Sequence, residues 1–294
     1  MQGNNARIRL ILSMMVFGTI GLVSRYIQLP SSLMACVRAY IGVLVILLYF
    51  MLRRKWPDRE AIRRNLPVLI AAGAMMGFNW ILQFESFRYT TIAIATVCYY
   101  MQPIFVMMAA PFLFREKLSG KRICCILIAF AGMILVSGAL QTGFDLSQMK
   151  GVLLAVAGAA LYAGVVLINK KLRDIDAIDA TVIQLLVAGT AALPYTLMTE
   201  DLGSLEFRVT GVLLLLLLGA FHTGFCYIIY FDAIGKLKAQ TVAILSYIDP
   251  VEAVLLSALV LHEKLTWMTV AGAVMILGAT LISELGSQDP GTEG

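Results

Sequence analysis

The chain has 294 residues, of which 60% are hydrophobic and only 14% charged, and its formal net charge is +5. Soluble domains carry about a quarter of charged residues, so this composition excludes a soluble protein and indicates a membrane protein. The chain divides into ten apolar segments with short linkers, which leave no room for a soluble domain. Because lipid offers no hydrogen-bond partner to the backbone, each segment is predicted to be a transmembrane helix.

The predicted helices cover approximately residues 8–27, 33–52, 66–87, 91–112, 121–140, 151–169, 178–198, 210–231, 240–261 and 266–285. The first is too long for a secretory signal and is expected to be retained as a helix. The polar residues 286–294 are predicted to form a disordered cytoplasmic tail. The fold class is therefore an all-α, multi-pass protein of the cytoplasmic membrane.

The basic residues indicate how the chain is oriented in the membrane. If the N-terminus lies in the cytoplasm, seventeen of the 23 Lys and Arg residues fall on the cytoplasmic side and five outside. This bias follows the positive-inside rule and predicts that both termini are cytoplasmic. The basic loops therefore require no nucleic-acid partner. The five cysteines lack the spacing of metal ligands, and we predict neither a metal nor a cofactor.

The chain repeats itself at an offset of 147 residues. The matches include Gly77-Phe78 with Gly224-Phe225, Tyr100 with Tyr247, Pro103 with Pro250, and Glu116-Lys117-Leu118 with Glu263-Lys264-Leu265. Since each repeat holds five helices, an odd number, the second copy must be inverted in the membrane. We predict two repeats, 1–146 and 147–285, followed by the tail 286–294. Inverted repeats are typical of secondary transporters, whose substrate sites lie near the bilayer midplane.

The pattern Tyr100-x-x-Pro103-(x12)-Glu116-Lys117-Leu118 and its second copy, Asp249-Pro250-(x12)-Glu263-Lys264-Leu265, resemble the drug/metabolite transporter superfamily, EamA-type. The resemblance covers residues 7–285. It implies a ten-helix carrier in which helices 1–4 and 6–9 line a central cavity and helices 5 and 10 pack outside. Members carry amino acids, other metabolites and drugs, and the resemblance favours export.

Two carboxylates, Asp249 and Glu252, stand near the middle of the ninth predicted helix beside Pro250. A charge at that depth costs about 2.5–3.5 kcal/mol, so both acids need a protein partner or a use. Neighbouring helices could simply satisfy them. Alternatively they bind a cationic group or exchange a proton, and mutual repulsion one turn apart favours proton uptake by one of them. Pro250 and its counterpart Pro103 are expected to bend their helices.

Arg38, within the second helix, is the natural counter-ion for these acids, and its repeat counterpart is Gln184. If Arg38 does not pair with Asp249 or Glu252, it is free to bind a substrate carboxylate. An arginine on one side of a cavity and carboxylates on the other suit a zwitterion such as an amino acid.

Other polar and aromatic side chains on the predicted cavity helices complete the candidate site. His222 is either a packing residue or a proton relay. Trp80 and Tyr227 are repeat mates, and aromatic rings can stack on planar or cationic solutes. The remaining candidates are Asn79, Tyr99 and Gln102. Glu85 and Asp232 are interpreted as gate-region residues, and Glu116 and Glu263 as interfacial caps of helices 5 and 10.

These features predict a secondary-active carrier of small organic solutes, such as amino acids or related amine metabolites, that works by alternating access. A proton is the expected coupling ion. The sequence does not distinguish a monomer from a homodimer. An alternative is a facilitative importer or exchanger of cationic or aromatic metabolites such as quaternary amines, nucleobases or drugs. A remote alternative is an intramembrane enzyme. Such an enzyme would need a zinc triad or paired catalytic residues on adjacent helices, and the sequence shows neither. The sequence contains no nucleotide-binding loop of the Gly-x4-Gly-Lys-Ser/Thr kind, so we do not expect ATP to drive transport directly.

Overall fold

The computed structural model describes residues 2–114, 119–137 and 145–286, and these contain helices and no strand. Eight helical stretches within them are long and apolar enough to cross a membrane. The prediction of an all-helical membrane protein is confirmed, whereas ten crossings and the side of the termini stay predictions. The motif Glu116-Lys117-Leu118 and the tail from residue 287 lie outside the described residues.

Four of the eight candidate spans are single helices: α3 (Ser31–Arg53), α4 (Arg59–Tyr89), α8 (Leu146–Asn169) and α9 (Ala177–Thr199). The other four are interrupted: α1 (Gln2–Gly18) with α2 (Ile20–Arg25), α5 (Ile92–Tyr99) with α6 (Gln102–Phe114), α10 (Val209–Leu217) with the π-helical η2 (Leu218–Phe225) and α11 (Cys226–Ile234), and α12 (Ala239–Ser246) with α13 (Ile248–Leu259). Two further helices, α7 (Gly120–Val136) and α14 (Trp267–Gly286), and the short 3-10 turn η1 (Leu202–Ser204) complete the described chain.

Two of the four interruptions fall at equivalent places in the two predicted repeats. The break before α6 lies at Tyr100 and the break before α13 at Tyr247, each three residues ahead of a proline. Proline clashes with the carbonyl group one turn earlier and removes a backbone donor, which accounts for both positions. The break at Thr19 between α1 and α2 has no proline.

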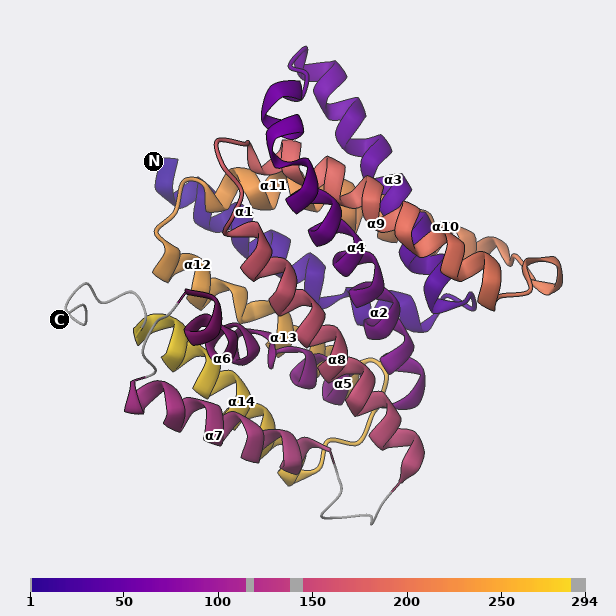
Figure 1. Cartoon of the computed structure of the whole chain (residues 1–294). Coiled ribbons are helices and arrows are strands. Elements are labelled where there is room, and N and C mark those ends of the chain that lie inside the picture. The colour runs from indigo at the N-terminus through magenta and orange to yellow at the C-terminus, as the bar shows by residue number, and fades with distance from the viewer. Residues whose placement is uncertain (1, 115–118, 138–144, 287–294) are drawn as a thin grey trace.

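Contacts between helices bring the two halves of the chain together. In Figure 1, α7 and α14 lie side by side along one edge of the molecule. A Cβ atom built on Gly272 would lie 2.5 Å from the carbonyl oxygen of Gly132, so these glycines permit the close approach of the two backbones. Elsewhere α4 packs on α8 and α9, α1 on α11, α3 on α9, and α5 on α13.

The repeated glycines Gly77 and Gly224 have the same packing role in the two halves. A Cβ atom on Gly77 would lie 2.5 Å from the carbonyl oxygen of Ala188 on α9, and one on Gly224 would lie 2.5 Å from Cβ of Val45 on α3. Both positions therefore require a residue without a side chain. This requirement explains why both repeats have glycine at this position.

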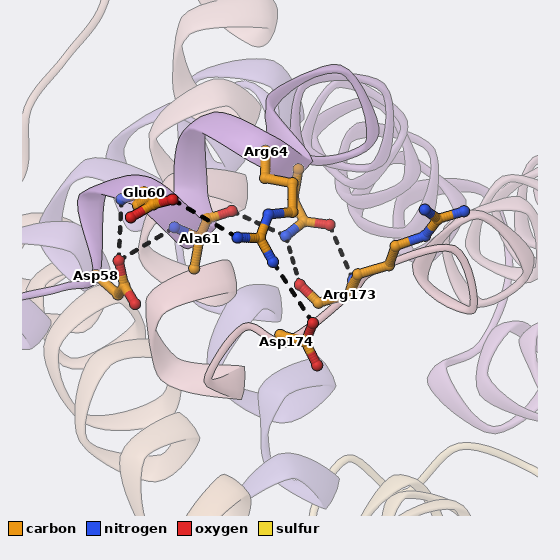
Figure 2. A network of polar contacts seen from close by, with 7 residues as sticks. Asp58, Glu60, Ala61, Arg64, Arg173 and Asp174 are labelled. Carbon is orange, nitrogen blue, oxygen red and sulfur yellow. Dashed lines mark hydrogen bonds and ion pairs between the residues drawn. The ribbon is translucent and has the colours of Figure 1, made fainter.

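A polar network fixes the start of α4 to the connection between α8 and α9 (Figure 2). Asp58 caps α4 by accepting from the backbone amides of Glu60 and Ala61. Buried Asn65 donates to the carbonyl oxygen of Arg173 at 2.8 Å and accepts from the backbone amide of the same residue at 2.9 Å. These reciprocal bonds join α4 and the α8–α9 connection into one unit.

Candidate functional site

Asp249 lies in the first turn of α13, directly after the break at Tyr247. Its Oδ2 atom accepts a hydrogen bond from the hydroxyl of Tyr100 at 2.9 Å, and the same hydroxyl lies 3.3 Å from the carbonyl oxygen of Ser246. Tyr100 occupies the corresponding break in the first half. The two helix breaks therefore meet through Tyr100, whose single hydroxyl hydrogen can be donated either to Asp249 or to the carbonyl group of Ser246.

Glu252 lies one turn further along α13 and faces the break in the first span. Its Oε2 atom is buried and has no hydrogen-bond partner among the described residues. A Cβ atom built on Gly18 would lie 3.0 Å from this oxygen and 3.0 Å from the carbonyl oxygen of Asp249. Gly18 thus lets the end of α1 approach the acidic turn of α13. A buried carboxylate oxygen without a donor is costly unless it is protonated or binds a cation.

Arg38 is 3% exposed and forms no ion pair within the part of the chain that the structure describes. Its Nε atom donates to the hydroxyl of Thr223 at 3.0 Å, and its guanidinium group lies 4.1 Å from the ring centroid of Trp80. Of the two alternatives for Arg38, an ion pair with Asp249 or Glu252 is therefore not the one seen in this structure. The ring of Trp80 and the hydroxyl of Thr223 contact the guanidinium group in place of an acid. Neither carries a negative charge, so the positive charge of Arg38 is not compensated by an anion.

Tyr99, the last residue of α5, is hydrogen-bonded to α4. Its hydroxyl donates to Oδ1 of Asn79 at 3.2 Å, and Asn79 in turn donates to the carbonyl oxygen of Gly158 on α8 at 2.7 Å. This chain of hydrogen bonds holds Tyr99 between α4 and α8. Further aromatic rings lie nearby. The ring centroids of Tyr162 and Tyr99 are 6.0 Å apart, and those of Tyr227 and Phe17 are 5.7 Å apart.

His222 lies in the π-helical stretch η2, beside the Thr223 hydroxyl that holds Arg38. Its Nδ1 atom is 3.2 Å from the carbonyl oxygen of Leu217, which can only accept, so Nδ1 carries a hydrogen. Its Nε2 atom is 2.9 Å from the hydroxyl of Thr19 at the α1–α2 break. The Thr19 hydroxyl donates its hydrogen to the carbonyl oxygen of Val16 at 2.7 Å, so an imidazolium can donate to it, whereas a neutral imidazole accepts only if the hydroxyl turns away from Val16.

Two predicted site residues have other surroundings. Gln184 donates to Oδ1 of Asn169 at 2.8 Å and so joins α9 to the end of α8. The Oε1 atom of Gln102 is buried without a hydrogen-bond partner in the described part of the chain. Among the hollows formed by the described residues, one includes Gln28 and Glu206 and another Met75 and Tyr195, and neither of these two is lined by a predicted site residue.

Two contributors to this region are missed by sequence reasoning, Thr19 and Thr223. The two threonines have no distinguishing pattern. Their roles depend on helix partners that the sequence does not reveal.

The geometry is that of a polar interior shared by both halves of an all-helical membrane protein. A sequence profile of the EamA-like transporter family matches residues 6–138 and again residues 149–284. The chain belongs to the EamA-like transporter family. The resemblance drawn from the repeated motifs is thereby confirmed.

Curated relatives of this EamA-like chain are similar over most of its length. The uncharacterized transporter YxxF of Bacillus subtilis is 27% identical and aligns with 100% of this chain and 94% of its own. The probable amino-acid metabolite efflux pump of Escherichia coli is 27% identical over 72% of this chain and 76% of its own. A solved crystal structure with 19% identity superposes with a TM-score of 0.67 and covers 96% of this chain and 97% of that one, which shows the fold.

Proposed function

We propose that this EamA-like transporter is a secondary-active carrier that exports amino acids or related amine metabolites across the cytoplasmic membrane. The observation that carries the proposal is Arg38, a buried guanidinium group without an acidic partner in the described chain. Such a group is the preferred partner of a carboxylate, which it binds through two parallel hydrogen bonds. Asp249 and Glu252 offer anionic oxygens to an amine. A zwitterion satisfies both kinds of group.

The name of the E. coli relative, a probable amino-acid metabolite efflux pump, supports the same solute class and the direction of export. The aromatic rings around Tyr99 and Tyr227 favour solutes with an apolar or planar part. The same rings, together with the two acids, suit cationic or aromatic metabolites as a second candidate class. We propose carriage without chemical conversion of the solute.

We further propose that the chain works as two inverted five-helix repeats with ten crossings and both termini in the cytoplasm. The profile matches the chain twice, in ranges of similar length. Helix contacts have the matching symmetry, because α4 packs on α8 as α11 packs on α1, and α7 pairs with α14. In Figure 1, α1 begins and α14 ends on the same side of the molecule. Rocking of one repeat against the other then exposes the central residues to each side in turn.

The solute class is tested by thermal unfolding of the purified protein with amino acids, polyamines, quaternary amines and purines. A solute that binds the folded protein raises the melting temperature by mass action. Amino acids with an apolar side chain are expected to stabilise the protein, whereas their decarboxylated amines stabilise it less. Stabilisation by quaternary amines or purines alone would favour the second candidate class.

Proton coupling is tested by flux into proteoliposomes across a range of pH. An amide cannot exchange a proton, so Asp249→Asn or Glu252→Gln is expected to lower proton-driven accumulation at least tenfold and to flatten its pH dependence. Glu200→Gln is a matched control, because Glu200 follows the last residue of α9 and accepts a hydrogen bond from Ser32 on α3. If both variants keep the wild-type pH profile, neither carboxylate couples transport to protons.

A further inference from the structure

Glu263 joins several helices at the end of the molecule where α5 begins. Its Oε2 atom accepts from the backbone amide of Ile92, the first residue of α5, at 3.0 Å, and from the hydroxyl of Ser257 near the end of α13. Its Oε1 atom lies 3.9 Å from Nη2 of Arg25, the last residue of α2. Arg25 also donates to the carbonyl oxygen of Phe87 on α4. One carboxylate thus links elements from both halves of the chain.

This arrangement differs from the expected one, in which Glu263 caps the tenth helix. The helix α14 begins four residues later, at Trp267, and the hydroxyl of Thr266 accepts from the backbone amide of Thr269 in its first turn. Glu263 instead stabilises the positive end of α5, a helix of the first repeat. A cap that belongs to another repeat holds only while the two repeats keep this relative position.

The equivalent helices α5 and α12 differ in how closely they are packed. Every residue of α5 from Ile92 to Cys98 is buried. In α12, the corresponding helix at the 147-residue offset, none of the residues from Thr241 to Ser246 is buried. The helix α5 is therefore covered on all sides by the rest of the described chain, while α12 is covered less completely.

We propose that Glu263 is the latch that closes the α5 end of the transporter. Release of the bonds to Ile92, Ser257 and Arg25 lets the first turn of α5 separate from α2 and α13, and the α12 end then closes. This inference rests on the proposed alternating access and assigns Glu263 a role in transport beyond that of a helix cap.

The test is the reactivity of single cysteines with a hydrophilic maleimide in nanodiscs, where both faces are accessible. Reporters on α5 are the native Cys98, with the other four cysteines replaced by serine, and, in a background with all five native cysteines replaced by serine, Ala93→Cys and Ala95→Cys. The reporter on α12 is Val242→Cys in the same background. In Glu263→Gln, which loses the charge that attracts Arg25, the labelling rate on α5 is expected to rise about tenfold while that of Val242→Cys falls.

The reciprocal change separates a latch from a simple cap. Loss of a cap alone frays α5 and raises its labelling without any change on α12, a result that would overturn the proposal. Unchanged labelling at all three α5 positions would overturn it as well. Glu200→Gln, which alters a hydrogen bond of α9 to Ser32, is expected to leave all reporters at wild-type rates.

These readouts need no solute, so they are independent of the assigned substrate. If labelling changes reciprocally but no tested amino acid is transported, the latch stands and the solute proposal fails. If amino acids are transported and labelling does not respond, the solute proposal stands and the latch fails.

Discussion

Replacement of Arg38 by methionine is expected to abolish transport of carboxylated solutes and to spare that of the corresponding amines. Hydrogen bonds to a charged partner contribute about 1.5–3 kcal/mol each, and a loss of about 3 kcal/mol lowers affinity roughly a hundredfold. We therefore expect Arg38→Met to reduce amino-acid flux about a hundredfold, and the flux of the decarboxylated amine by less than about threefold. Arg38→Lys keeps the charge but not the planar fork, so its activity should be intermediate.

The melting temperature of the solute-free protein supplies the control for this prediction. Arg38 is a buried cation, and Trp80 and Thr223 are its neighbours in place of an acid. Because burial of an uncompensated charge opposes folding, Arg38→Met should unfold at the wild-type temperature or above it. A lower melting temperature, together with an equal loss of flux for the amino acid and its decarboxylated amine, would indicate that Arg38 stabilises the fold and does not bind the carboxylate of the solute.

The second large effect concerns Gly77, where α4 and α9 approach most closely. A Cβ atom at this position would lie 2.5 Å from the carbonyl oxygen of Ala188 and 3.1 Å from its carbonyl carbon. Both are backbone atoms that cannot rotate away, so the helices must separate. Overpacking of this kind costs about 1–3 kcal/mol. We expect Gly77→Ala to lower the melting temperature in detergent clearly and Gly77→Leu to prevent folding.

Gly278 on α14 provides the matched control. A Cβ atom there meets no heavy atom within 4 Å. Since alanine is the better helix former, Gly278→Ala should be neutral or stabilise the protein by up to about 1 kcal/mol. Equal destabilisation by Gly77→Ala and Gly278→Ala would mean that the close approach of α4 and α9 does not determine stability.

Much of the fold follows from the sequence, because lipid allows a long apolar segment few structures other than a helix. Eight of the ten predicted segments coincide with candidate spans. The positions of Pro103 and Pro250 also indicate where helices are interrupted. The break at Thr19 could not be predicted, since no proline causes it and His222, its contact, is 203 residues away.

The candidate site shows where pattern reasoning ends. Residue types and depth indicate that Arg38, Asp249 and Glu252 are unusual, but spacing within one helix does not give distances between helices. The sequence therefore left open whether Arg38 pairs with one of the acids, and in the structure Trp80 contacts the guanidinium group instead. The role of Glu263 was similarly assigned to the adjacent helix, because its partner Ile92 is 171 residues away in the chain.

Solute counterflow in proteoliposomes tests the central claim most directly. Vesicles that contain the purified protein and a high internal concentration of an unlabelled apolar amino acid are diluted into a trace of the isotope-labelled form, and the solute is identified by mass spectrometry. The labelled amino acid is expected to accumulate transiently and unchanged with the wild-type protein, and not with Arg38→Met. A chemically converted solute, or no accumulation of any solute that stabilises the protein, would contradict the assignment as a carrier.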